Sequence, residues 1–373
     1  MKYCTKCLLP DTKPYLIFDD NGICSACKAH EMKKNRDHGI DWTQKKEQFK
    51  ALIDEIKTLN APFYDVLVPV SGGKDSITQV HRLLGNNLRI LAVNIDYGIK
   101  TEIGKYNLDL IPKMGAHLLI YRPEINLHKK LIKIGFEDFG DPDLLSHTLL
   151  HAYPLHIALQ FKIPMVLLGE NSAIEYSGEY SYDETDSISR DWFLKYAANK
   201  GITASDISKK YNIALKKLWM YDYPENFENS NIKAIFSSSY FFWDSESHLK
   251  IAKTYGFKTL KHCSEGTYRN YVGLDEKINR IHQYLKLLKL GYGRATDHAC
   301  EDIRNGRISR EAAKELIQKH DTLNLSDSYV DDFIQFINIS RENFYNILEL
   351  YRNLEIWKKD SFGNWFIPHH LEG

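Results

Sequence analysis

Short, continuous apolar runs alternate along the chain with stretches in which apolar residues recur at helical spacing. The runs are rich in β-branched residues, which is typical of strands buried on both faces of a sheet. They cover residues 65–70, 89–96, 117–121 and 164–168. Because strands that alternate with helices form parallel sheets, we predict an α/β fold with a doubly wound, mostly parallel sheet.

Beyond residue 274 the pattern becomes helical. Apolar residues within 278–288, 330–337 and 344–351 repeat every three or four positions, which predicts three amphipathic helices. Ser309 and Ser340 stand where helix N-caps are expected. The chain therefore ends in a predicted helical region.

Four of the six cysteines form two C-x-x-C pairs close to the N-terminus. These are Cys4 with Cys7 and Cys24 with Cys27, and sixteen residues separate the pairs. Two such pairs supply four thiolates to a tetrahedral Zn²⁺ ion, and with a short strand at 15–18 they predict a zinc-ribbon-like module. An iron–sulfur centre and redox-active thiols are the alternatives. A closed shell of four sulfurs favours a structural Zn²⁺ that staples the module.

The first predicted strand leads directly into a glycine loop and then into a predicted helix. The loop consists of Ser71, Gly72, Gly73, Lys74, Asp75 and Ser76. In this context backbone N–H groups and a helix N-terminus bind phosphate, Lys74 adds positive charge, and Asp75 can hold Mg²⁺ or cap the helix. An acidic residue follows the lysine, so the loop is not a Walker A motif. A plain glycine turn before a helix is the alternative.

Polar residues follow the second and fourth predicted strands, at the edge where open α/β sheets bind ligands. They are Asp96 after the second strand, and Gly169, Glu170, Asn171, Glu175 and Tyr176 after the fourth. We expect Asp96 and Gly169 to contact a nucleotide, and the last three residues to bind substrate. Glu170 joins Lys74 and Asp75 as a candidate catalytic residue. A turn that caps the following helix is the alternative for this segment.

A charged stretch at 291–307 is predicted to form glycine turns between the C-terminal helices. Its charged residues include Arg294, Asp297, Arg304 and Arg307. Because Arg makes bidentate contacts with carboxylate and phosphate, we expect these four residues to bind an anionic substrate. A solvated, charged loop is the alternative.

Composition excludes several classes of protein. Lys plus Arg number 49, as do Asp plus Glu, and the formal net charge is zero. A dedicated nucleic-acid binder usually carries a basic excess, so we expect no nucleic-acid partner. The longest apolar runs are far shorter than the roughly 20 residues that cross a bilayer, which predicts no membrane span. Paired cysteines of the metal-binding type favour a cytoplasmic location.

The loop at 71–76 resembles the SGGxDS motif of the PP-loop ATP pyrophosphatases. A narrower resemblance, to the bacterial N-acetyl sugar amidotransferases of the WbpG and PseA type, rests on motifs spread over nearly the whole chain. These are the four paired cysteines, the loop, residues 169–171, Trp243-Asp244, Gly266-Thr267-Tyr268, and the segments GRATD at 293–297 and DIRNGR at 302–307. His298 departs from the family's pattern, which has an acidic residue at this position.

The resemblance implies a PP-loop reaction on a nucleotide-activated or acidic acetamido sugar destined for O-antigen or flagellin glycans. ATP adenylates the amide oxygen, pyrophosphate leaves, and ammonia then displaces AMP to give an acetamidino group. The implied cofactors are ATP and Mg²⁺ beside the structural Zn²⁺. We divide the chain into a Cys4 module at 1–40, a PP-loop domain at 41–262, and a helical region at 263–373 that contributes to the substrate site.

The source of ammonia lies outside this sequence. Cys263 and Cys300 both lack the setting of a glutaminase nucleophile. The resemblance implies a trans-acting glutaminase (HisH-like) and a HisF-like subunit as partners. The alternative functions are a PP-loop tRNA thiolase and a non-catalytic nucleotide sensor. The absence of cysteine between Cys27 and Cys263 and the zero net charge speak against the thiolase.

Overall fold

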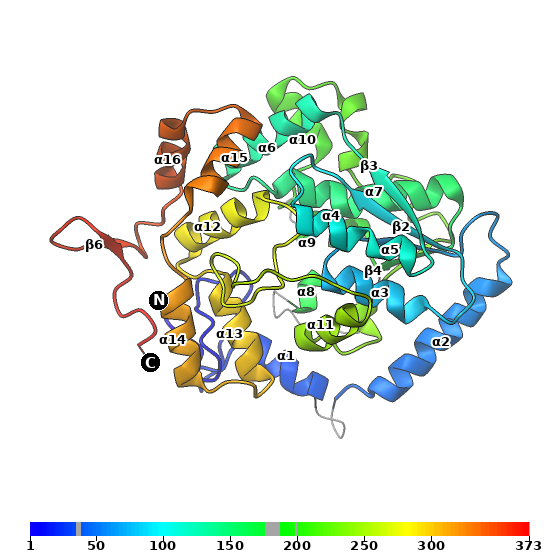
Figure 1. Ribbon diagram of the computed structural model, residues 1–373, viewed down its shortest axis with the longest axis horizontal. Coiled ribbons are helices and arrows are strands. Elements are labelled where there is room, and N and C mark those ends of the chain that lie inside the picture. The colour runs from blue at the N-terminus through cyan, green and yellow to red at the C-terminus, as the bar shows by residue number, and fades with distance from the viewer. Residues whose placement is uncertain (35–38, 176–186, 198–199, 373) are drawn as a thin grey trace.

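A five-stranded sheet forms the centre of the protein in the computed structural model, which describes residues 1–34, 39–175, 187–197 and 200–372 (Figure 1). All its strands are parallel, in the order β3-β2-β1-β4-β5. They are β1 (Val66–Pro69), β2 (Ile90–Ile95), β3 (His117–Tyr121), β4 (Met165–Leu168) and β5 (Lys233–Phe236). The predicted doubly wound parallel sheet is confirmed, and β1 to β4 lie within the four predicted runs. β5 was not predicted, because it begins with Lys233 and only three apolar residues follow.

Helices surround the sheet and make up most of the remaining structure (Figure 1). In chain order they are α1 (Ser25–Lys34), α2 (Trp42–Thr58), α3 (Lys74–Leu83), α4 (Glu102–Leu108), α5 (Leu110–Lys113), α6 (Ile125–Phe139), α7 (Leu144–Phe161), α8 (Ser172–Glu175), α9 (Arg190–Tyr196), α10 (Ala204–Tyr211), α11 (Ser245–Thr254), α12 (Ile278–Leu290), α13 (Arg294–Arg304), α14 (Arg310–His320), α15 (Asp327–Ile337) and α16 (Arg341–Leu350). Three short 3₁₀ helices, η1 (Leu215–Lys217), η2 (Trp219–Tyr221) and η3 (Ser237–Ser239), and a small hairpin of β6 (Lys358–Lys359) and β7 (Trp365–Phe366) complete the elements.

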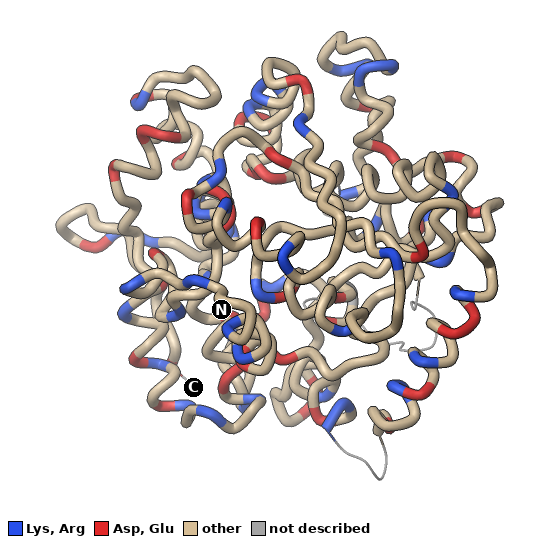
Figure 2. Tube along the Cα trace, turned by 45° about the vertical axis from the view of Figure 1, so that its right-hand side comes forward, with Lys and Arg blue, Asp and Glu red and all other residues tan. Residues whose placement is uncertain are grey.

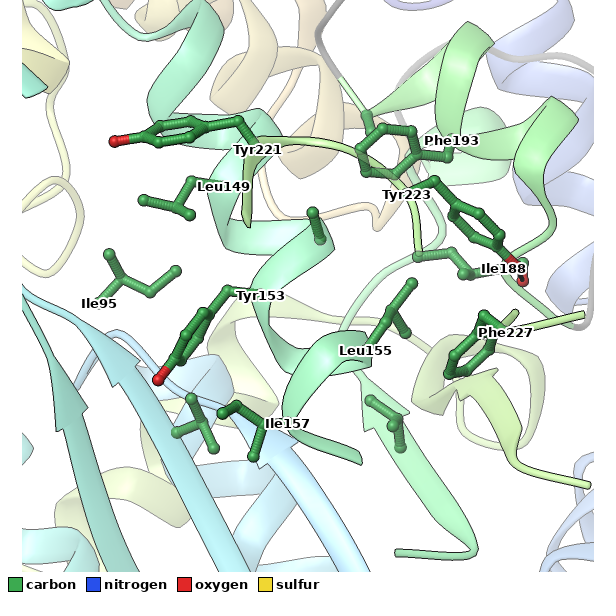
Figure 3. Close-up of a cluster of buried hydrophobic side chains, with 14 of the residues drawn as sticks. Ile95, Leu149, Tyr153, Leu155, Ile157, Ile188, Phe193, Tyr221, Tyr223 and Phe227 are labelled. Atoms are coloured by element: carbon green, nitrogen blue, oxygen red, sulfur yellow. Dashed lines mark hydrogen bonds between the residues drawn. The ribbon is translucent and has the colours of Figure 1, made fainter. Parts of the chain in front are cut away.

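Alternate strand residues face two different helical layers, because successive side chains of a strand point to opposite faces. Leu67 and Val166 pack on one face with α7. Val68 and Leu167 pack on the other face with α2, α3 and α11. Figure 3 shows the first layer, where side chains of α7 lie between the sheet and aromatic side chains such as Phe193. The strands β1, β2 and β4 are therefore buried on both faces, which explains their continuous apolar runs, whereas the edge strand β3 is partly exposed.

The strand order creates a crossover between β1 and β4. The chain passes from β1 through β2 to β3, and it then returns to the other side of β1 as β4. Segments that leave two such strands in opposite directions open a crevice at their carboxyl ends, where ligands bind in this type of sheet. The glycine loop follows β1 and residues 169–171 follow β4, so both predicted ligand-binding segments lie at this crevice.

The N-terminal cysteine module packs against the C-terminal helices (Figure 1). Leu8 and Leu9 are buried with Tyr292 and with residues of α13 and α14. The strand predicted at 15–18 is wrong, since Phe18 alone forms an antiparallel bridge, to Cys24. The physical reason is the backbone of Tyr15, whose φ of 62° interrupts an extended conformation.

The predicted helical C-terminal region is confirmed, with one correction. The three predicted apolar stripes lie on α12, α15 and α16, which form a common core with α6. Ser309 and Ser340 cap α14 and α16 by accepting backbone N–H bonds. The stretch predicted as glycine turns is wrong in part, because Arg294 to Arg304 form helix α13. The glycines flank this helix instead: Gly293 is its N-cap residue, and Gly306 follows its end.

Basic and acidic residues are interspersed along the trace in Figure 2, as equal numbers of the two allow. None of the helices among the described residues is both long enough and apolar enough to pass through a membrane.

Candidate active site

A cavity of about 630 Å³ lies beyond the carboxyl ends of β1 and β4. Part of its lining, which we call the loop wall, comes from residues 69–79 around the glycine loop and from residues 168–175 after β4. Another part, which we call the module wall, comes from residues 9–33 of the cysteine module and from α12 and α13. Segments from both ends of the sequence therefore meet in one cavity.

The glycine loop is held in shape by its own hydroxyl groups. Ser71 N–H donates to Ser76 Oγ at 2.9 Å, and Gly73 N–H donates to Ser71 Oγ at 3.1 Å. Gly72 has φ +92°, and a Cβ there would lie 2.9 Å from Leu108 N, so glycine is required. Helix α3 begins after Gly73 without a side-chain cap, which leaves N–H groups of its first turn for an anion.

Six predicted ligand-binding residues of this loop divide into two groups. Ser71, Lys74, Asp75 and Ser76 line the cavity. The two glycines shape the loop without lining the cavity. The loop thus presents hydroxyl, ammonium and carboxylate groups on one short segment.

The Asp75 carboxylate is held by two side chains. Its Oδ2 lies 2.7 Å from Lys74 Nζ, and its Oδ1 lies 2.7 Å from His248 Nδ1. Arg82 Nη2 donates to His248 Nε2 at 3.0 Å, so the proton of His248 is on Nδ1 and is donated to Asp75. Burial acts to raise the pKa of Asp75, but the Lys74 charge and the His248 hydrogen bond outweigh it and hold this pKa well below its usual range. Asp75 is therefore a fixed, ionised carboxylate at the cavity.

The segment after β4 contributes unevenly to the cavity. Gly169 and Glu170 line it, as does Glu175, whose Oε1 forms an ion pair with Lys33 Nζ at 2.6 Å. Asn171 is fully buried outside the lining, and its Oδ1 accepts a hydrogen bond from Trp192 Nε1 at 3.1 Å. The ion pair of Glu175 with Lys33 joins the loop wall to the cysteine module.

Of two further predicted residues, one lies away from the cavity and the other is not among the described residues. Asp96, at the end of β2, accepts from Gly98 N–H at 3.0 Å and pairs with Arg122 Nε at 2.7 Å. Burial acts to raise the pKa of Asp96, and these two contacts outweigh it. Tyr176 lies outside the described residues, so its predicted role in substrate binding stays a prediction.

Helix α13 carries three of the four predicted anion-binding residues into the module wall. Arg294 and Asp297 line the cavity near its N-terminus and Arg304 near its C-terminus. Arg294 donates to Asn279 Oδ1, and Lys286 pairs with Asp297. Arg307 lies outside the lining. Its guanidinium pairs with Asp244 at 2.6 Å and with Asp302 at 2.6 Å.

Motifs that are far apart in the sequence interlock around α13. Thr267 Oγ1 lies 2.6 Å from His298 Nδ1. The Arg269 guanidinium forms ion pairs with Glu301 at 2.7 Å and with Asp302 at 2.8 Å. Burial, followed by the neighbouring Arg and Lys charges, lowers the pKa of His298 well below its usual range, so a neutral imidazole faces the cavity. The segments at 244, 266–269 and 294–307 therefore form one polar network that holds α13 in place.

The four paired cysteines form a compact cluster. All four side chains are fully buried, and their sulfur atoms lie within 4.8 Å of one another. Sulfur separations of 3.9 Å between Cys4 and Cys27 and 3.7 Å between Cys7 and Cys24 match the about 3.8 Å edge of a tetrahedron with Zn–S bonds of about 2.3 Å. Backbone N–H groups, such as that of Cys24 at 3.2 Å from Cys4 Sγ, point at the sulfurs and suit thiolates. These residues fit a Zn²⁺ ion.

The cluster also contacts α13, which sequence reasoning did not foresee. Arg304 Nη1 lies 3.9 Å from Cys7 Sγ. Cys300 is fully buried beside the cysteine cluster and belongs to the same hydrophobic core. An arginine of the cavity and a thiol of its supporting helix thus lie against the cysteine site.

Several residues of the site were not predicted. They are Lys13, Lys33, Arg82, His248 and Arg269. The sequence does contain a signal for His248: Asp244 is the N-cap residue of α11, and His248 follows it by one helical turn. The module lysines gave none, since their part in the cavity depends on how two distant segments pack.

The parallel sheet and the glycine loop at its crossover define the class of this protein: a doubly wound α/β protein with a cavity beside a glycine loop. Residues 265–370 match the family model described as LPS biosynthesis protein WbpG-like, C-terminal domain. The resemblance to WbpG-like proteins is therefore confirmed over this part of the chain.

Two other comparisons add less. Among solved structures, an NAD⁺ synthetase from Burkholderia pseudomallei aligns over 86% of this chain and 96% of that chain, at 11% sequence identity and a TM-score of 0.29. A search of curated proteins finds no match. The similarity to WbpG-like proteins thus covers residues 265–370, and the fold rests on the sheet itself.

Proposed function

We propose that this protein is an ATP-dependent amidotransferase that converts the acetamido group of a bacterial surface-sugar precursor into an acetamidino group. The observation that carries the proposal is the shared cavity. The loop wall contributes Lys74 and Asp75, and the WbpG-like region contributes Arg294 and Arg304. A nucleotide at the loop and an anionic sugar at α13 would then meet with their reacting atoms in one enclosed space.

The chemistry follows from the weakness of an amide as an electrophile. The amide oxygen attacks the α-phosphorus of ATP, the bond to the bridging oxygen breaks, and pyrophosphate leaves. Ammonia then attacks the activated carbon, the carbon–oxygen bond breaks, and AMP leaves with the former amide oxygen. Loss of a proton completes the amidine.

The loop wall supplies the groups that the first step needs. In this proposal Ser71, Ser76 and the first N–H groups of α3 bind the departing pyrophosphate, and Lys74 offsets its charge. Asp75 is fixed and ionised, so it is suited to hold Mg²⁺, which would neutralise phosphate charge when bound. Glu170, at the cavity after β4, is the candidate to accept the proton that ammonia loses.

The ammonia source in this proposal is a separate glutaminase (HisH-like) acting with a HisF-like subunit. Cys263 is exposed, and Cys300 is buried against the cysteine module, so neither lies in the setting of a catalytic nucleophile. Free ammonium at high concentration replaces the partner in an assay of this chain alone.

The decisive experiment measures pyrophosphate release from ATP with different acceptors. We expect release with nucleotide-linked or acidic acetamido sugars and none with the deacetylated sugars. With ammonium present, mass spectrometry is expected to show the acetamido oxygen replaced by NH. Release that requires tRNA and ignores the sugar would overturn the proposal in favour of a thiolase.

A variant tests whether the loop wall binds ATP and the module wall binds the sugar. Arg294→Ala is expected to raise the KM for the sugar about tenfold, the size of one charge-assisted contact, and to leave the KM for ATP unchanged. The matched control is Arg341→Ala on the exposed face of α16, which should alter neither value. Equal losses for sugar and ATP would contradict the assignment of Arg294.

A further inference from the structure

The cysteine module places in the cavity a lysine that pairs with none of the residues that the structure describes. Lys13 lies between the two cysteine pairs and lines the module wall. Within the described ranges its ammonium makes neither a side-chain hydrogen bond nor an ion pair. The other module lysine at the cavity, Lys33, differs because it pairs with Glu175.

The backbone around Lys13 is firmly held. Lys13 N–H donates to Pro10 O at 3.1 Å, and Leu16 N–H donates to Lys13 O at 3.2 Å, which closes a tight turn. Next to it, Thr12 Oγ donates to Leu290 O at 2.6 Å, at the end of α12. The module and α12 thus fix where Lys13 enters the cavity.

The charges that act on Lys13 include both signs. The nearest in effect are those of Asp297, Lys286 and Arg304. Asp297 is already paired with Lys286, and Arg304 lies against Cys7. Lys13 is half-buried, and burial, which disfavours the charged form, lowers its pKa to about 8 although Asp297 acts to raise it.

We propose that Lys13 of the cysteine module, together with Arg304, forms a subsite for an oxyanion of the sugar substrate. A bound carboxylate or phosphate supplies the counter-charge that the described residues do not give to Lys13. The oxyanion belongs either to a uronic acid or to the diphosphate of a nucleotide carrier. This inference rests on the proposed sugar-modifying function, and it assigns the cysteine module a direct part in substrate recognition.

The test measures binding by calorimetry without turnover, with a non-hydrolysable ATP analogue and Mg²⁺ saturating the glycine loop. The titrants are N-acetylglucosamine, its uronic acid and UDP-N-acetylglucosamine. The wild-type protein is expected to bind at least one anionic probe about tenfold to a hundredfold more tightly than the neutral sugar. Lys13→Met should lose that preference, and Lys13→Arg should keep most of it.

The matched control is Lys28→Met, an exposed lysine of the same module that pairs with Asp19. It should bind every probe as the wild type does, and zinc content should be equal in all variants. A loss confined to the uronic acid identifies the carboxylate, and a loss confined to the UDP-sugar identifies the diphosphate. Retained preference in Lys13→Met, or equal binding of all three probes by the wild type, would overturn the inference.

The two proposals fail in different assays. If the proposed function is wrong, pyrophosphate release will not depend on the sugar. Failure of the Lys13 subsite appears as unchanged probe binding in Lys13→Met while release still depends on the sugar.

Discussion

The loop wall and the module wall carry similar polar groups but are built in different ways. In the glycine loop of the loop wall many contacts are local: Ser71 N–H and Ser71 Oγ both contact Ser76 Oγ within one loop. In the module wall the partners are far apart in sequence, as in the pairs of Arg307 with Asp244 and of Arg304 with Cys7. A loop held by local contacts at the edge of a sheet needs few contacts with other segments. The module wall, in contrast, keeps its shape only while the contacts between its distant segments are intact.

Removing the zinc site is the strongest way to separate the two walls. Cys24→Ser is expected to lose the metal and to unfold the module. We expect the free energy of unfolding of the module to fall by more than about 4 kcal/mol. Sugar-dependent pyrophosphate release should then be lost, while binding of an ATP analogue to the loop wall falls only a few-fold. Zinc analysis and calorimetry measure the two effects. Cys263→Ser, an exposed thiol outside the cluster, is the control. Equal loss of both ligands would show that the walls are not independent.

Breaking the polar network should come next in size. Arg269 is nearly fully buried between Glu301 and Asp302, so Arg269→Met removes one charged partner from each carboxylate and leaves Arg307 as the other. We expect about 3–5 kcal/mol less stability in denaturant unfolding, with sugar binding affected more than ATP binding. Arg341→Met removes an exposed pair and should leave the unfolding midpoint unchanged. A stable Arg269→Met variant would mean that α13 is held by apolar packing alone.

A change in the loop wall should have the opposite selectivity. Gly72→Ala combines a positive φ with a contact of 2.9 Å to Leu108 N, at a cost of about 1–3 kcal/mol. ATP-analogue affinity should fall about tenfold or more, and sugar binding should not change. Gly85→Ala also has a positive φ but meets nothing within 4 Å, so it separates backbone strain from the clash. Unchanged nucleotide affinity in Gly72→Ala would remove the loop from the nucleotide site.

The smallest effect is expected at His248, which supports Asp75 of the loop wall from helix α11. His248→Gln loses a hydrogen bond that orients Asp75, worth about 1 kcal/mol, or roughly fivefold in the rate of pyrophosphate release. Sugar affinity should stay the same. His262→Gln, at an exposed position, is the control. A rate equal to that of the wild type would show that Lys74 alone positions the carboxylate.

The same contrast explains how much the sequence could predict. Contiguous signals were sufficient for β1 to β4, for the glycine loop and for the cysteine cluster, because strand, loop and ligand spacing are local properties. The helix α13 was mistaken for turns because its flanking glycines dominate the pattern, although its interior residues favour a helix. Lys13, Lys33 and Arg269 had no local signal, since each acts through a partner or a cavity that only the folded chain brings to it.

The position of the module in the cavity also couples two equilibria. Under the two proposals above, Lys13 binds substrate and lies between the cysteine pairs that would hold Zn²⁺, so zinc binding and substrate binding would share one coupling free energy. By reciprocity, whatever factor the metal adds to substrate affinity, bound substrate adds to metal affinity. We expect the substrate-loaded protein to keep its zinc at chelator concentrations that strip the free protein. When zinc is scarce, zinc would therefore dissociate first from substrate-free protein, and substrate-bound protein would retain it.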